Sequence, residues 1–175
     1  MTGKMLEAFD GTREAGSIAS GALDEITKII KPGITTNKID KFCFEYINDN
    51  GAYSAPLFYR GFPKSCCTSP NHIVCHGIPK DKVLKEGDIV NVDVTALKNG
   101  WHGDTSRMYF VGEVSTKAKK LVKTTYEAMI KSIKILKNGI QVGDIGSIIQ
   151  KHVESQGFSV VRDFCGHGTG KNFHQ

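Results

Sequence analysis

The sequence lacks the features that mark membrane proteins, secreted proteins and zinc ribbons. It has no apolar run long enough to span a membrane, and its first residues, MTGKMLEAFDGTREAG, contain no apolar core of a signal peptide. Its five cysteines are an odd number, and no two of them form a C-x-x-C pair. This pattern argues against a disulfide framework and favours a reducing compartment, so we expect a cytoplasmic protein.

Strong net charge is also absent. The chain has 175 residues, of which 39% are hydrophobic and 23% are charged, and its formal net charge is +5. This composition is typical of a globular protein with a sizeable core. Lysines gather within residues 117–137, where they indicate either a solvated helix face or a contact with nucleic acid or a ribosome.

Two aspartates stand in a segment that otherwise has the pattern of a β-hairpin. In NVDVTALKNGWHGDTSR, residues 91–107, Asn99-Gly100 separates two alternating runs and predicts a two-residue turn. With that turn, Asp93 lies opposite Ser106 and Asp104 lies opposite Thr95, so the two carboxylates are diagonal neighbours on one face. The other face of the first strand carries Val90, Val92 and Val94, which suits a core.

The paired aspartates have two interpretations. In the first, they are tolerated on a solvated face at a sheet edge; in the second, they bind a cation between them. Without a cation their repulsion should raise the pKa of one carboxyl.

The chain contains an internal repeat at an offset of 106 residues. The segment KPGITTNKIDKFCFEYINDNGAYS starts at Lys31, and KNGIQVGDIGSIIQKHVESQGFSV starts at Lys137. Both carry an amphipathic helical stripe followed by a glycine stop. Helices over about 13–30 and 115–136 precede them, the latter with a cap at Ser115-Thr116. Two similar amphipathic helices without duplication are the alternative explanation.

Each half therefore follows the order helix, K-x-G-I turn, helix, glycine, strand. The first half continues into the aspartate hairpin. A counterpart of that hairpin at the same offset would fall beyond residue 175, so we expect residues 1–175 to be a single domain whose second repeat is incomplete.

The histidines offer further candidate ligands. His167 lies between two glycines in CGHGTG, and His76 lies in the VCHGIP loop. The alternative for both is a structural or exposed histidine. The sequence GHGTG is weak evidence for a phosphate-binding loop, because no Lys-Ser/Thr follows it. His102 shares the aspartate face if the hairpin register holds, and His152 lies on an apolar stripe that indicates packing. Two aspartates and one histidine form a reasonable partial ligand set for a divalent metal.

Three separated sequence motifs resemble those of one protein family. NHIVCHGIP, GDIVNVDVTALKNGWHGDTSRMYFVG and FSVVRDFCGHGTGKNFH closely resemble the methionine aminopeptidases of the bacterial type I form, from about Arg13 to the last residue. The resemblance implies the α/β "pita-bread" fold, a pseudo-two-fold sandwich with a dinuclear metal site at its centre. Prolidase, aminopeptidase P and creatinase share that fold but resemble this chain less.

The resemblance also implies roles for individual residues. Asp93, Asp104 and His167 match metal ligands, while the family's two glutamate ligands, one of them a general base, have no match here. His76 matches a histidine on the scissile amide nitrogen side, and His174 matches one that stabilises the oxyanion. The methionine pocket matches Tyr59, Phe62 and Phe173, with Phe62 in place of a frequent tyrosine.

The implied function is removal of the initiator methionine from nascent proteins. Two divalent ions (Co, Mn, Fe or Zn) would activate a hydroxide for attack on the methionyl bond. The expected partners are a peptide or nascent N-terminus that begins with Met and a transient ribosome contact, with no membrane and no specific nucleic acid. Alternatives are a catalytically inactive truncated family member that acts as a binding protein, or an X-prolyl peptidase of the same fold. The activity of the 175-residue chain alone is expected to be poor.

Overall fold

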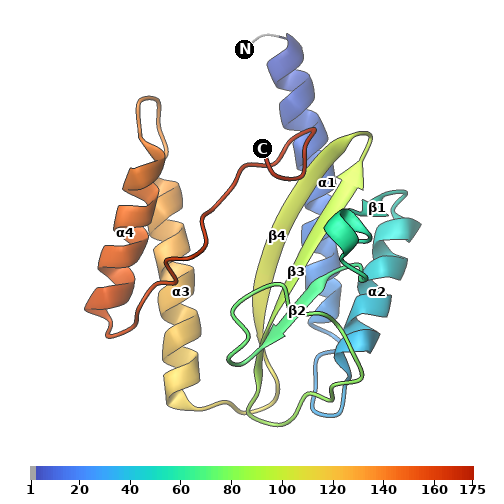
Figure 1. The fold of residues 1–175 in the computed structure, drawn as a ribbon, viewed down its shortest axis with the longest axis vertical. Coiled ribbons are helices and arrows are strands. Elements are labelled where there is room, and N and C mark those ends of the chain that lie inside the picture. The colour runs from blue at the N-terminus through green and yellow to red at the C-terminus, as the bar shows by residue number, and fades with distance from the viewer. Residues whose placement is uncertain (1–2) are drawn as a thin grey trace. The chain divides into compact units, whose positions relative to one another are not determined.

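The computed structural model describes residues 3–175 and divides them into two compact units. The first unit consists of residues 3–114 together with 167–175, and the second consists of residues 115–166 (Figure 1).

An antiparallel sheet forms the centre of the first unit. Strands β3 (Ile89–Lys98) and β4 (Trp101–Phe110) pair over their full length, from Ile89 opposite Phe110 to Lys98 opposite Trp101. Asn99 and Gly100 both have positive φ, 51° and 80°, as a tight hairpin turn requires. The short strands β1 (Tyr53–Ser54) and β2 (Cys67–Pro70) pair with two stretches of the other edge of β3. The predicted hairpin and its register are therefore confirmed.

Two helices contribute to the core on one side of this sheet. The long α1 (Gly3–Ile26) packs against β3 and β4, and α2 (Thr36–Asp49) contacts α1, β1 and β2. The predicted core face is confirmed, because Val90, Val92 and Val94 are fully buried. The Tyr109 hydroxyl donates to the Leu23 carbonyl of α1 at 2.6 Å and ties the helix to β4. The opposite face of the hairpin is thereby left for the aspartates.

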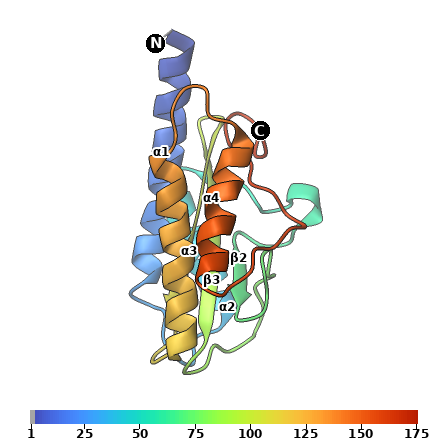
Figure 2. The same ribbon diagram turned by 90° about the vertical axis from the view of Figure 1, so that its left-hand side faces the viewer.

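The second unit is a pair of packed helices, α3 (Thr116–Lys134) and α4 (Val142–Ser155), followed by an irregular segment. Figure 2 shows the two helices side by side. The predicted cap of α3 is confirmed, because the Ser115 hydroxyl accepts a hydrogen bond from the Ala118 amide at 3.2 Å. His152 packs against α3, with its ring nitrogens near Lys131 (2.7 Å) and Glu127 (3.2 Å).

Backbone geometry supports the predicted repeat. Gly33 and Gly139 have φ of 93° and 89°, and Gly51 and Gly157 have φ of 65° and 80°. Only glycine adopts this left-handed region without strain. The residues that precede α2 and α4 also share an extended conformation, with φ of −93° in both. Positions 106 residues apart thus have the same local structure.

Two sequence expectations for the elements are wrong. The first helix runs from Gly3 to Ile26 rather than from about 13 to 30. No strand follows Gly157 within the described residues, whereas β1 does follow Gly51. A strand needs a partner for its backbone groups: β1 pairs with β3, and residues after Gly157 have no such neighbour in the described chain.

The single domain predicted over residues 1–175 stays a prediction. In the described chain, no helix combines the length and the apolar character that crossing a bilayer would need.

Candidate metal and peptide-binding site

The two hairpin aspartates occupy the face that the register predicts. Asp93 of β3 lies opposite Ser106, and Asp104 of β4 lies opposite Thr95, so the carboxylates are diagonal neighbours. The Thr95 hydroxyl donates to Asp104 Oδ1 at 2.7 Å, which fixes the orientation of that carboxylate. The sequence places Thr95 opposite Asp104 but does not show that its hydroxyl holds this carboxylate.

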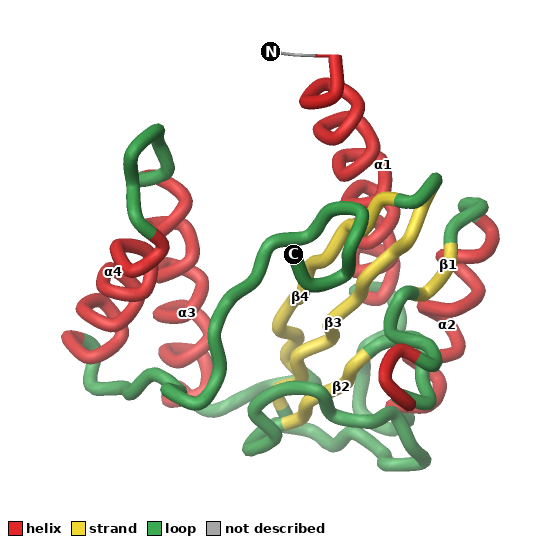
Figure 3. The backbone as a smooth tube through the Cα atoms, turned by 45° about the horizontal axis from the view of Figure 1, so that its top comes forward, coloured by secondary structure: helices red, strands yellow, loops and turns green. Residues whose placement is uncertain are grey.

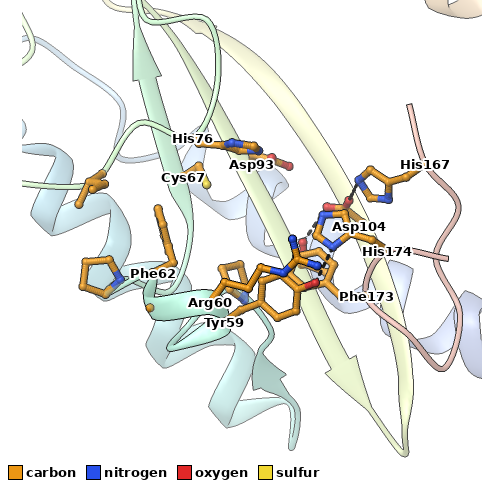
Figure 4. A pocket seen from close by; sticks show the side chains of 15 residues that line it. Tyr59, Arg60, Phe62, Cys67, His76, Asp93, Asp104, His167, Phe173 and His174 are labelled. Carbon is orange, nitrogen blue, oxygen red and sulfur yellow. Dashed lines mark hydrogen bonds and ion pairs between the residues drawn. The ribbon is translucent and has the colours of Figure 1, made fainter. Parts of the chain in front are cut away.

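His167 reaches the same face from a segment far away in the sequence. Its Nε2 lies 3.6 Å from Asp104 Oδ2 (Figure 4). The other ring nitrogen, Nδ1, lies 3.0 Å from the Gly168 carbonyl. Asp104 and His167 are therefore close enough to share one cation, since each ligand atom would stand about 2.0–2.2 Å from it.

Backbone hydrogen bonds hold the segment 167–175 against the hairpin, and Figure 3 shows this segment beside the strands. The His102 amide donates to the Gly170 carbonyl at 2.9 Å, and His102 Nδ1 lies 3.0 Å from the same oxygen. The amides of Gly168 and Gln175 each donate to the carbonyl of the other, at 3.1 and 2.9 Å. His102, which shares the aspartate face as predicted, thus positions the segment that carries His167.

His174 is fixed by its aromatic neighbours. Its Nδ1 lies 3.0 Å from the Tyr59 hydroxyl. Its ring centroid lies 4.4 Å from that of His167 and 4.5 Å from that of Phe173. Tyr59 and Phe173 also contact one another, with ring centroids 4.8 Å apart. The two histidines and the aromatic wall therefore form one connected cluster.

His76 lies in the loop after β2 with a positive φ of 53°. The loop returns close to β2, because the Thr68 amide donates to the Gly77 carbonyl at 2.8 Å and the Gly77 amide donates to the Ser69 hydroxyl at 3.1 Å. A side chain at position 77 would overlap the Thr68 backbone, so this approach requires glycine. The tight return places the imidazole of His76 at the site.

All eight sequence-predicted site residues line one cavity of about 460 Å³ in the first unit. Its wall is formed mainly by carbon atoms, and the two aspartates lie on the hairpin side. Sequence reasoning missed several of its residues, because nothing in their local pattern distinguishes them. The residues that line the cavity are Pro56, Tyr59, Arg60, Gly61, Phe62, Pro63, Cys67, His76, Ile78, Asp93, Thr95, Asp104, His167, Phe173 and His174.

Burial and mutual repulsion perturb the titratable groups of the cavity. Burial, followed by repulsion from Asp104, raises the pKa of Asp93 to about 6, and the charge of His167 partly opposes this shift. The expectation that one carboxyl pKa rises is confirmed, although burial rather than repulsion is the larger cause. Burial also raises the pKa of Cys67 to about 12. Partial desolvation lowers the pKa of His174, and the charges of His167 and Arg60 act in the same direction.

The donor set fits a divalent cation in part. Two carboxylates and an imidazole are suitable ligands for hard or borderline metals. The Asp104–His167 pair has the required proximity, and a nearby cation would offset the unfavourable ionisation of Asp93. Within residues 3–175, however, no three such side chains are close enough together to hold one ion. The ligand roles of Asp93, Asp104 and His167 therefore stay predictions.

Comparison with known proteins supports this chemistry. The sequence profile of metallopeptidase family M24 matches residues 10–175. A methionine aminopeptidase of Rickettsia prowazekii is 54% identical over 166 residues, which cover 95% of this chain and 64% of that protein. The chain therefore spans a little less than two thirds of the length of this relative.

Solved structures give the same result. The crystal structure of a methionine aminopeptidase from Rickettsia prowazekii superposes with a TM-score of 0.94 at 53% identity, covering 96% of this chain and 68% of that one. The prolidase from Pyrococcus furiosus has a TM-score of 0.82 at 23% identity, covering 97% of this chain and 49% of that one, and so shares the fold alone. The predicted α/β pita-bread fold is confirmed by these likenesses. Matched over residues 10–175 and similar throughout to a methionine aminopeptidase, the chain belongs to metallopeptidase family M24.

Proposed function

We propose that this protein removes the N-terminal methionine from nascent proteins as a metal-dependent aminopeptidase. The observation that carries the proposal is the single cavity that gathers Asp93, Asp104 and His167 beside the aromatic wall. The 54% identity to a methionine aminopeptidase supports it. An X-prolyl activity has less support, because the likeness to the prolidase is limited to the fold.

In this proposal the chain's carboxylates and imidazole hold the metal. Asp93, Asp104 and His167 would bind two divalent ions, with Co, Mn, Fe or Zn as the candidates. When bound, such ions polarise a carbonyl and lower the pKa of a water ligand. The Thr95 hydroxyl orients Asp104 for this task, and the Gly168 carbonyl near Nδ1 of His167 leaves Nε2 directed at Asp104.

The aromatic wall would receive the methionine side chain. Tyr59 and Phe173 are in ring contact, and both line the cavity with Phe62. A thioether gains about 0.3–1.5 kcal/mol from contact with aromatic rings. The wall thereby favours an unbranched sulfur-containing side chain over a polar one.

The two remaining histidines would act on the scissile peptide bond. With the Tyr59 hydroxyl donating to Nδ1, the proton of neutral His174 lies on Nε2. The lowered pKa of His174 favours this neutral form, which can donate to the developing oxyanion. His76, on the loop after β2, would contact the amide nitrogen side. No glutamate lines the cavity within residues 3–175.

The cellular setting follows from the substrate. We propose that the protein acts in the cytoplasm on N-termini that begin with Met, and its five cysteines are free thiols in keeping with a reducing compartment. Exposed lysines of α3, within residues 117–134, would make a transient contact with the ribosome. We propose neither a membrane nor a specific nucleic-acid partner.

The test is peptide hydrolysis by the complete gene product. We expect cleavage of Met-Ala-Ser with added manganese or cobalt, loss of cleavage with a chelator, and little cleavage of an X-prolyl peptide. Asp104→Asn should reduce kcat/KM by at least about 100-fold, in line with the loss of a metal ligand or its immediate support. The control Asp49→Asn, at the exposed end of α2, should leave kcat/KM unchanged. Cleavage of the X-prolyl peptide alone, or an inactive product with intact metal binding, would contradict the proposal.

A further inference from the structure

Arg60 is the one Lys or Arg side chain among the described residues that line the cavity. It belongs to the short 3₁₀ turn Tyr59–Gly61, and its side chain is exposed at the margin of the site. Its guanidinium carbon lies 5.5 Å from the centroid of the Tyr59 ring. In Figure 4 the side chain extends across Tyr59 toward His174. The roles proposed above do not use this cation.

The backbone around Arg60 is held in an unusual conformation. Phe58 and Arg60 both have positive φ, 65° and 47°, a backbone conformation that residues other than glycine rarely adopt. The loop is closed by hydrogen bonds from the Phe58 amide to the Phe62 carbonyl (2.7 Å) and from the Phe62 amide to the Tyr59 carbonyl (2.9 Å). The closed loop fixes the direction in which the Arg60 side chain leaves the backbone. Stacking on Tyr59 then directs the guanidinium along the cavity margin.

The guanidinium has no carboxylate partner of its own in the described chain. No salt bridge within residues 3–175 includes Arg60. The carboxylate of Asp104, which lines the same cavity, accepts a hydrogen bond from Thr95 and lies beside His167. A planar guanidinium at a fixed position is well suited to a carboxylate supplied by a ligand.

The charge of the substrate determines which of its ends this cation can attract. The N-terminal ammonium of a methionyl peptide is positive, so Arg60 would repel it. A carboxylate on the other side of the scissile bond would instead be attracted. Such a carboxylate can be an Asp or Glu side chain or the terminal carboxylate of a short peptide.

We propose that Arg60 is a specificity-determining residue that favours peptides with a carboxylate shortly after the scissile bond. The inference rests on the proposed function and names a substrate class for the same cavity. The contact lies at an exposed margin, so its effect is moderate: we expect about a 3- to 10-fold preference in kcat/KM, within the range for exposed to half-buried charge pairs. The preference should appear mainly in KM, since the contact exists before and during reaction.

The experiment compares matched peptides on the complete gene product. Met-Ala-Asp-amide and Met-Ala-Asn-amide differ in charge but hardly in shape, and Met-Ala-Ser as acid and amide tests the terminal carboxylate separately. The wild type should prefer the charged member of at least one pair, and high salt should reduce this preference. Arg60→Gln should bring the ratio close to one, and Arg60→Lys should retain part of it. Arg13→Gln, which removes an exposed charge from α1, should keep the full ratio.

Two results would overturn the inference: no preference in the wild type for either charged member, or a preference that survives Arg60→Gln. If no methionyl peptide is cleaved, the proposed function fails independently. Calorimetric titration of the same peptides then decides the role of Arg60, because a charge-dependent affinity that Arg60→Gln abolishes supports it and an equal affinity for both members refutes it.

Discussion

Asp93 lies where its own charge is unfavourable in the metal-free fold. Burial and the neighbouring Asp104 raise its pKa from 3.8 to about 6. An acid whose pKa is higher in the folded state than in the unfolded state binds more protons when folded. Its ionisation therefore destabilises the fold as pH rises from about 4 to about 6, and the full cost is present at neutral pH.

Asp93→Asn should accordingly stabilise the metal-free protein at pH 7.5 by about 1–3 kcal/mol, since one pKa unit corresponds to about 1.4 kcal/mol. The gain should shrink as the pH falls from about 6 and approach zero only below about pH 3, where the wild-type carboxyl is protonated in both the folded and the unfolded state. Urea unfolding with a chelator at a series of pH values measures this difference. Asp49→Asn, on an exposed helix end, should show no such dependence. A gain that is independent of pH would remove the electrostatic explanation.

Thr95 acts on the site through Asp104. Its hydroxyl donates to Asp104 Oδ1 at 2.7 Å, and Thr95 itself is buried. Thr95→Val keeps the shape but removes the donor, so metal affinity should fall by about 10- to 100-fold, the usual effect of losing a hydrogen bond to a metal ligand. Calorimetric manganese titration tests this. Thr105→Val, on the opposite face of the same hairpin, is the matched control, and equal affinities in the two variants would contradict the role of Thr95.

At the residue scale, the sequence was informative where a local pattern fixes geometry. Asn99-Gly100 determines the turn, the turn determines the register, and the register places Asp93 and Asp104 on one face. Arg60 and Cys67 also line the cavity, but no periodicity or spacing indicates it. Their placement depends on a loop with two positive φ values and on a short strand, neither of which local propensity specifies.

At the scale of elements, the contact between α1 and β4 depends on a glycine. A Cβ at Gly103 would overlap the backbone of Ala15 and Gly16 in α1, whereas a Cβ at Gly16 would meet nothing within 4 Å. Gly103→Ala must push the helix away from the sheet and should destabilise the protein by about 1–3 kcal/mol. Gly16→Ala should stabilise it by about 0.5–1 kcal/mol through helix propensity. Urea denaturation of both variants measures the two shifts, and shifts of the same sign would show that the helix contact is not close.

The sequence predicted the type of a secondary-structure element more often than the residues at which it begins and ends. The stripe and glycine stop of α2 recur in α4, and both helices form. The first ten residues of α1 were not expected, because glycines at positions 3 and 11 reduce helix propensity and no acidic residue marks the first turn. The strand expected after Gly157 is absent from the described chain, since strand formation depends on a pairing partner rather than on the preceding glycine.

At the scale of the whole molecule, the candidate site joins two distant parts of the chain. The hairpin at residues 89–110 and the segment 167–175 belong to the same unit although residues 115–166 form another. Local sequence could place the aspartates on one face and offer His167 as a candidate ligand, and the resemblance to a family then matched all three residues to one metal site. The contacts of His102 with Gly170 provide the physical connection.

A metal that binds both parts should stabilise that unit selectively. At a manganese concentration of about a hundred times its Kd, binding adds about 2.7 kcal/mol of stability. For a chain of this size that corresponds to a rise in Tm of about 5–10 °C. The rise should be larger at pH 7.5 than at pH 5, because protons compete with the metal for Asp93 below its pKa of about 6.

Hydrogen exchange locates the effect along the chain. Added manganese should slow exchange most in residues 89–110 and 167–175 and least in α3 and α4. His167→Ala should abolish this protection, whereas His72→Ala, an exposed residue outside the cavity, should preserve it. The physical reason is that a ligand on segment 167–175 must be ordered for the metal to bind, so binding free energy is used to hold that segment against the hairpin. Protection that appears equally in α3 and α4 would show that both units respond to the metal as one body.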